Sequence, residues 1–335
     1  IVHLVSRRIP TSLTGFPNGL ILHDAAITRS RLRGRSEDVI FAEDPRLIQK
    51  ARRGLSFIEP IGGGEATVVR RGLPKFFDVD TACLADVSSI LGGDSCDMPS
   101  RSQSQVAASK LFAASIKHAT SSNALISVTR LQKANGENAQ VSYHAATGQW
   151  VLCSKNVSIL ASCASELELP QWADRRYRFA RQVAALWFLQ LSALEESSCG
   201  VLKDTLASRT LIGEMVGGSG AHLVQYGPDR KLQWFAIVPH QGDEACWLPS
   251  LTSKFFHKIG LPTVEFGQQE VYATAATFLE ALRKMVMTVE KTPLNEAGEG
   301  YVLYITAGST PDRLEAGAKV IYLGKLKTAE YRVLR

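Results

Sequence analysis

The stretch Leu125-Ile-Ser-Val-Thr-Arg-Leu131-Gln132-Lys133-Ala-Asn-Gly136 decides how the rest of the chain is interpreted. Its first seven residues are mostly β-branched or aliphatic, which predicts a strand that ends near Leu131. Lys133 then stands at the strand end, and Gly136 follows three residues later. A strand end holds an amine rigidly, and a glycine turn lets the backbone approach a ligand closely. The pattern indicates an amine nucleophile, but K-x-x-G is frequent by chance and equally fits an ordinary surface turn.

The composition is that of a globular protein with a substantial core. The chain has 335 residues, of which 45% are hydrophobic and 21% are charged. At about 150 residues per domain this length fits one large domain or two modest ones. No stretch approaches ~18 consecutive apolar residues, so we expect no membrane span. The 38 Lys and Arg residues against 32 Asp and Glu give a formal net charge of +6, which permits a phosphate-bearing partner without proving one.

The cysteines indicate the compartment rather than the chemistry. The chain has 6 of them, scattered and without a C-x-x-C pair, which is too sparse for a disulfide-stapled secreted scaffold. We therefore expect an intracellular, reducing compartment, with cytoplasm, nucleus and mitochondrion left open. We also expect a monomer.

Hydrophobic patterning predicts an α+β protein with mostly antiparallel sheets flanked by helices. The first fifty residues, 1–50, are expected to form an irregular N-terminal extension, and 51–335 one domain. Residues 82–122 are expected to be an insertion that contributes no nucleotide contact. Strands are predicted at 55–58, 66–69, 76–79, 124–131, 139–145, 149–154, 210–215, 222–226, 232–239, 300–306 and 319–323. Helices are predicted at 44–53, 103–118, 171–196 and 268–289.

Further motifs follow Lys133 in a fixed order. They are Ser154-Lys155-Asn156, Leu211-Ile-Gly-Glu214, Trp234-Phe235-Ala-Ile-Val238, Glu299-Gly300-Tyr-Val-Leu303 and Lys325-Leu-Lys327. In this order they resemble the collinear motifs of the covalent nucleotidyltransferase superfamily, which contains RNA ligases, DNA ligases and mRNA capping enzymes. One such motif arises by chance, whereas the ordered set is specific.

The segment upstream of Lys133 points to a subgroup. Arg53-Gly54-Leu-Ser-Phe57 and Lys75-Phe76-Phe77-Asp-Val-Asp80 resemble the R-G…K-F-F-N-x-x-E signature of phage-type and fungal tRNA-ligase-like RNA ligases. The chain departs from the family at Asp78 and Asp80, which replace Asn and Glu, and at Glu137, where Ser or Thr is usual. The resemblance extends from about residue 50 onward.

The resemblance implies a nucleotidyltransferase (ATP-grasp-like ligase) fold and ATP-dependent RNA ligation. Lys133 would attack the α-phosphorus of ATP and form a lysine–AMP intermediate. The AMP would pass to an RNA 5′-phosphate, and an RNA 3′-hydroxyl would displace it. ATP, Mg²⁺ or Mn²⁺, and RNA with these two ends are the implied partners. The implied catalytic residues are Lys133, Glu299, Lys325 and Lys327; the nucleotide-binding residues are Arg53, Lys75, Gln132, Gly136, Lys155, Glu214 and Phe235; the metal-binding residues are Glu214 and Glu299.

These residue types suit the implied chemistry. Cations beside a reactive amine favour its neutral form and stabilise charge on a phosphate. Carboxylates suit ribose hydroxyls and a hydrated Mg²⁺. Phe235 would stack on adenine, and Trp234, on the opposite face of the same strand, would replace it in a register shifted by one.

Other interpretations remain at this stage. Lys325 and Lys327 also fit a charged strand edge that prevents aggregation. A capping-type guanylyltransferase would use the same lysine chemistry with GTP. A catalytically inactive RNA-binding module of the same fold is a third possibility.

Overall fold

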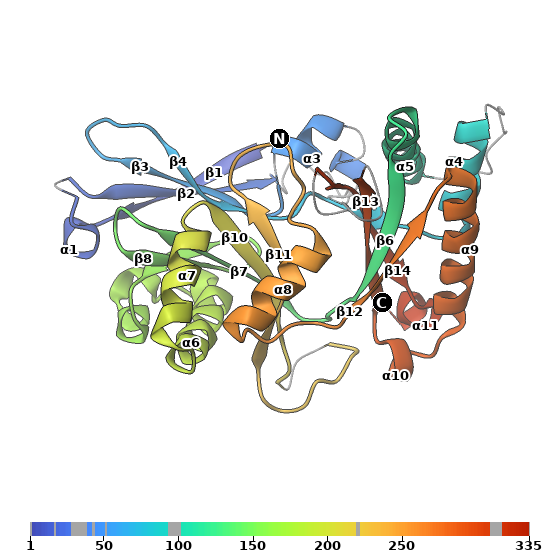
Figure 1. The fold of residues 1–335 in the computed structure, drawn as a ribbon. Coiled ribbons are helices and arrows are strands. Elements are labelled where there is room, and N and C mark those ends of the chain that lie inside the picture. Colours follow the sequence, from blue (N-terminus) through green and yellow to red (C-terminus); the bar gives the residue numbers. More distant parts are fainter. Residues whose placement is uncertain are drawn as a thin grey trace.

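The computed structural model describes residues 2–16, 18–27, 39–41, 44–50, 52–92, 102–218, 222–308 and 317–334. Three sheets form the frame of this part of the chain (Figure 1). All their strand pairs are antiparallel except one, the short pair of β14 and β5. The predicted α+β class with mostly antiparallel sheets flanked by helices is therefore confirmed.

The N-terminal sheet has the order β1-β2-β3-β4. Its strands are β1 (Val2–Ile9), β2 (Leu20–Ile27), β3 (Leu55–Pro60) and β4 (Thr67–Arg71). The expectation that the first fifty residues are irregular was wrong, because β1 and β2 pair over eight residues each and β2 then pairs with β3. The short helix α1 (Thr11–Thr14) lies between β1 and β2, and α3 (Pro45–Lys50) precedes β3.

The central sheet has the order β11-β10-β7-β8-β9. Its strands are β7 (Glu137–His144), β8 (Gln149–Cys153), β9 (Ser158–Ala161), β10 (Arg209–Val216) and β11 (Lys231–Pro239). Helices α6 (Arg178–Ser192), α7 (Glu196–Leu206) and α8 (Pro249–Ile259) pack on it. Three buried indoles join sheet and helix: Trp187 lies 5.1 Å from Trp150 and 5.5 Å from Trp234, ring centroid to centroid, in edge-to-face geometry.

The C-terminal sheet has the order β12-β6-β13-β14-β5. Its strands are β5 (Phe77–Asp78), β6 (Leu125–Gln132), β12 (Phe266–Tyr272), β13 (Gly300–Gly308) and β14 (Lys319–Lys327). Helices α4 (Thr81–Gly92), α5 (Gln103–Ser121) and α9 (Ala275–Lys291) stand beside it (Figure 1) and share one buried core with β6, β13 and β14. The segment 82–122 thus supplies core side chains such as Leu84 and Phe112.

Several predicted boundaries change. The predicted helix 268–289 begins only at Ala275, because Thr274 caps α9 by accepting the Thr277 N–H and the preceding residues pair with β6 as β12. The predicted helix 171–196 divides into 3₁₀ turns at Pro170–Trp172 and Arg175–Tyr177, then α6 and the start of α7. The predicted strand 222–226 was wrong, since these residues form bends and irregular chain. Helix α8 was not predicted.

Smaller elements complete the described chain. They are a 3₁₀ turn at Ala164–Glu168 and the helices α10 (Leu294–Ala297) and α11 (Ala329–Leu334). Within the described ranges, no helix has the length and apolar content needed to cross a bilayer.

Candidate active site

A cleft of about 620 Å³ is lined by residues of both the central and the C-terminal sheet. Its lining includes every site residue predicted from the sequence: Arg53, Lys75, Gln132, Lys133, Gly136, Lys155, Glu214, Phe235, Glu299, Lys325 and Lys327. Apolar side chains packed together between the two sheets, among them Leu131, Ile212 and Tyr304, form part of the same wall. The structure therefore brings together residues that are far apart in the sequence.

Lys133 sits where the chain passes from one sheet to the other. Residues 133–136 join the end of β6 in the C-terminal sheet to the start of β7 in the central sheet. The Lys133 backbone N–H donates to the Gly300 carbonyl at 2.9 Å. Its Nζ lies 2.9 Å from Oε2 of Glu299, a carboxylate that is only 4% exposed. The lysine side chain is 16% exposed, so its amine is shielded but reaches the cleft.

Asn135 holds this turn in place from within. Its side-chain Nδ2 donates to Glu299 Oε2 at 3.1 Å and to the Tyr331 hydroxyl at 2.8 Å. Its Oδ1 accepts the Val224 N–H at 3.4 Å, and its own N–H donates to the Tyr226 hydroxyl at 3.0 Å. A buried amide with these partners fixes the turn and the carboxylate together.

Glu214 lies on β10 at the other wall of the cleft, and its Oε2 accepts the Gly136 N–H at 2.7 Å. Burial raises the pKa of Glu214 to about 7, although the Lys133 charge and the Gly136 hydrogen bond act in the opposite direction. The turn needs glycine here, because a Cβ at Gly136 would lie 2.3 Å from the Met215 carbonyl oxygen. Glu214 therefore titrates near neutrality beside the candidate nucleophile.

Lys325 and Lys327 alternate along β14 and reach the same carboxylate. Their Nζ atoms lie 3.8 Å and 3.3 Å from the two oxygens of Asp78. Strand β14 pairs with β13 on one side and with β5 on the other, where Lys325 is opposite Asp78. At Lys325 the alternative of a charged strand edge is therefore wrong, because β14 has a partner on each side there.

The register of β11 separates its two aromatic residues. Trp234 is fully buried, and its Nε1 donates to Gln190 Oε1 at 3.0 Å. Phe235 points the other way and lines the cleft. Of the two aromatic side chains, only Phe235 is available to a ligand in the cleft.

The described residues contain no group of three His, Cys, Asp or Glu side chains arranged to hold a metal ion. Two carboxylates nevertheless line the cleft, Glu214 and Glu299. Oε2 of Glu214 accepts the Gly136 N–H, and Oε2 of Glu299 pairs with Lys133. Mg²⁺ and Mn²⁺ bind through one or two carboxylates while keeping waters and substrate phosphates. The donor set fits such an ion.

Sequence reasoning missed Asn135, Tyr226 and Tyr331 as site residues. The hydroxyl of Tyr331 reaches Asn135 across 196 residues of sequence, so no local pattern marks it. Asn135 belongs to the Lys133–Gly136 segment, so a short amide side chain next to the candidate nucleophile was the available signal.

No family model matches the chain, and no curated protein matches it. The chain is similar to two solved forms of an archaeal ATP-dependent RNA ligase, at 14% identity and a TM-score of 0.46 for each. These matches cover 84% and 97% of this chain but only 53% and 64% of the archaeal ones. It is also similar to a Naegleria gruberi RNA ligase mutant solved with AMP and Mn, at 13% identity and a TM-score of 0.39, over 67% of this chain and 55% of that one. The chain thus spans less than two thirds of the length of these ligases, and likenesses of this size do not by themselves assign its function.

Proposed function

We propose that the chain is the adenylyltransferase part of an ATP-dependent RNA ligase, a member of the covalent nucleotidyltransferases, with Lys133 as its nucleophile. One observation carries the proposal. The motif residues come from separate strands, yet they line one cleft around an amine that is paired with a buried carboxylate.

The first step would be attack of the Lys133 amine on the α-phosphorus of ATP. An amine attacks only as the free base, and Glu299 lies within reach of its proton at 2.9 Å. The new P–N bond forms as the bond to pyrophosphate breaks, which leaves AMP on the lysine. Lys325 and Lys327 would stabilise negative charge on the α-phosphate, since cations placed in advance at developing charge lower the barrier.

The other cleft residues bind and orient the nucleotide in this proposal. Arg53 and Lys75 would bind the departing pyrophosphate, and Phe235 would stack on the base. Glu214 and Glu299 would hold Mg²⁺ or Mn²⁺, which would supply charge neutralisation at the phosphates when bound. The AMP would then activate an RNA 5′-phosphate, and an RNA 3′-hydroxyl would displace it.

Incubation with α-labelled ATP or GTP, followed by mass spectrometry of the intact protein and its peptides, tests the proposal. We expect an AMP adduct on Lys133 that Lys133→Ala abolishes. Lys284→Ala is a matched control, because Lys284 is 76% exposed and pairs with Glu280 on the surface of α9; it should label normally. Label from GTP alone would instead favour a capping-type guanylyltransferase. No adduct with any nucleotide, together with RNA binding, would favour the inactive RNA-binding module.

A further inference from the structure

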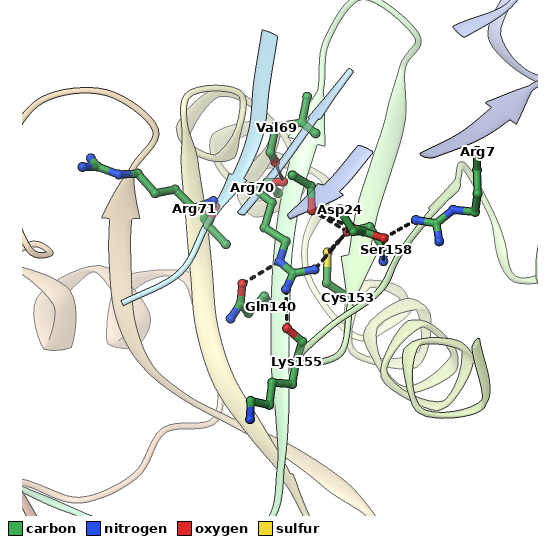
Figure 2. A network of polar contacts seen from close by, with 12 residues as sticks. Arg7, Asp24, Val69, Arg70, Arg71, Gln140, Cys153, Lys155 and Ser158 are labelled. Carbon is green, nitrogen blue, oxygen red and sulfur yellow. Dashed lines mark hydrogen bonds and ion pairs between the residues drawn. The ribbon is translucent and has the colours of Figure 1, made fainter. Parts of the chain in front are cut away.

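A buried polar network joins the N-terminal sheet to the central sheet (Figure 2). Its centre is Asp24 on β2, which is 1% exposed. Oδ1 of Asp24 accepts the hydroxyls of Ser56 at 2.7 Å and Ser158 at 2.6 Å, and Oδ2 accepts the Ser158 N–H at 3.1 Å. Arg7 on β1 forms an ion pair with the same carboxylate. The Asp24 charge is therefore already compensated within this cluster.

Arg70 on β4 extends the network toward the cleft. It is 1% exposed, and its nearest approach to Asp24 is 3.7 Å, longer than its hydrogen bonds to other groups. Its Nε donates to Gln140 Oε1 at 2.9 Å, and its Nη2 donates to the Lys155 carbonyl at 2.7 Å. The Lys155 side chain itself extends away from the network (Figure 2) and lines the cleft.

Gln140 on β7 continues the chain of contacts to a second cleft cation. It is 2% exposed, and its Nε2 donates to the Arg53 carbonyl at 3.0 Å and to Asn138 Oδ1 at 2.8 Å. Arg70 and Gln140 are thus hydrogen-bonded to each other. Gln140 also donates to the Arg53 carbonyl, and Arg70 donates to the Lys155 carbonyl.

The backbone around Arg53 is pressed against this pair. Gly54 has φ +96°, and a Cβ there would lie 2.4 Å from Arg70 Nη2 and 2.5 Å from Gln140 Oε1. A Cβ at Gly72 would lie 1.7 Å from the Arg53 carbonyl oxygen. Only glycine leaves room for the contact at both positions, so the Arg53 carbonyl is enclosed by Gln140 on one side and by Gly72, just after β4, on the other.

We propose that Arg70 and Gln140 are positioning residues that set Arg53 and Lys155 for the triphosphate of ATP. This inference rests on the function proposed above. Arg and Lys side chains are long and flexible, so the place of their charged ends depends on how firmly the backbone below them is held. A displacement of about 1 Å in a positioned group can cost ~10² in rate. The Arg70–Gln140 pair thereby acts on the reaction without touching the nucleotide.

Gln140→Glu tests the Arg53 branch. Glutamate keeps the shape of glutamine and an oxygen for Arg70, but it replaces the N–H donor with an oxygen that the Arg53 carbonyl repels. We expect single-turnover adenylylation to slow by about 10- to 100-fold. Ser142→Ala is the matched control: Ser142 is buried on the same strand and donates to the Val69 carbonyl of β4, a residue outside the cleft. Its adenylylation rate should stay within about threefold of normal.

A double-mutant cycle distinguishes positioning from general support of the fold. If Gln140 acts through Arg53, Gln140→Glu should slow an Arg53→Ala protein by less than about threefold further. Equal slowing in both backgrounds would overturn the inference. Should Gln140→Glu fail to fold, Gln140→Met, which keeps the volume and removes the donor, takes its place in the cycle.

A second cycle combines Arg70→Lys with Lys155→Ala and tests whether Arg70 acts through Lys155. We again expect Arg70→Lys to slow the Lys155→Ala protein by much less than it slows the wild-type protein. If none of the nucleotides labels the wild-type protein, the proposed function is overturned, and the inference with it. A wild-type protein that labels while both cycles are additive would overturn the inference alone.

Discussion

At the scale of single residues, Lys325 and Lys327 share Asp78 and face the same cleft. If both act on charge developing at the α-phosphate, loss of one donor should cost about 2.7–4 kcal/mol, or ~10²–10³ in rate. We expect Lys327→Ala to slow single-turnover formation of the lysine–AMP adduct by that factor, with a smaller change in the ATP concentration for half-maximal rate. This split follows because the charge is largest in the transition state. A near-normal maximal rate would remove Lys327 from the reaction.

Glu214 gives a prediction about pH at the same scale. Its pKa is about 7 in the folded protein, against 4.5 for the free side chain. Between these values the folded protein binds more protons than the unfolded chain, so its stability falls as pH rises from 4.5 to about 7. We expect Glu214→Gln to remove this part of the pH dependence of the free energy of unfolding. Urea unfolding of both proteins at several pH values across this window measures it, and identical slopes would contradict the raised pKa.

At the residue scale, the ordered motifs pointed to residues that the structure brings to one cleft. Lys133 follows the end of β6, whereas Glu214 and Lys325 lie within β10 and β14 and were singled out by the resemblance rather than by local patterning. Whether each residue has its proposed role stays a prediction. Arg70 and Gln140 could not be identified in this way, since their partners lie 70 to 88 residues away and a buried arginine has no local signature.

At the scale of elements, α4 and α5 have a different role from the one expected of an insertion. None of the described residues of this segment, 82–92 and 102–122, lines the cleft, and the absence of nucleotide contact stays a prediction. Yet Phe112 is fully buried, stacks on Tyr322 with centroids 4.4 Å apart and meets Phe278 edge-to-face. Deletion of the segment would therefore expose the core beside β6 and β14, and we expect a deletion variant not to fold.

A point substitution measures that contribution without removing the helices. Phe112→Ala should lower the free energy of unfolding by about 3–5 kcal/mol, because it leaves a cavity among aromatic neighbours. Adenylylation at low temperature should persist, since the cleft lies elsewhere. Leu189→Ala is the control, because Leu189 is 66% exposed on α6; its unfolding should change by less than about 0.5 kcal/mol. Equal denaturation midpoints for the two variants would contradict this account of the core.

Errors at the element scale also have physical causes. β12 was predicted as part of a helix because its polar residues Gln268, Gln269 and Glu270 are common in helices. Pairing with β6 overrides that preference. By contrast, the predicted strands 139–145 and 149–154 correspond to β7 and β8, which pair with each other, because short apolar runs depend only on neighbouring residues.

At the scale of the whole molecule, the N-terminal strands are bound to the rest through Asp24. Asp24→Asn removes the buried carboxylate that faces the part-buried Arg7 and the buried Arg70, and breaking a buried pair in this way costs about 3–5 kcal/mol. We expect a loss of that size in chemical denaturation, and a chain lacking β1 and β2 to be insoluble. Asp44→Asn is the control, because Asp44 pairs with the largely exposed Arg46. A stable protein without β1 and β2 would show that these two strands are dispensable.

The three indoles that join the central sheet to α6 also form a cluster of close chromophores. Trp150, Trp187 and Trp234 lie within 5.1 and 5.5 Å of their neighbours, with interplanar angles of 73° and 86°. Rings this close exchange excitation energy and couple their transition dipoles, so their absorption and emission belong to the trio rather than to separate chromophores. Trp234 is joined by one peptide bond to Phe235, which lines the cleft. Emission of the trio therefore reports on the packing of this core, on the face of β11 opposite the cleft.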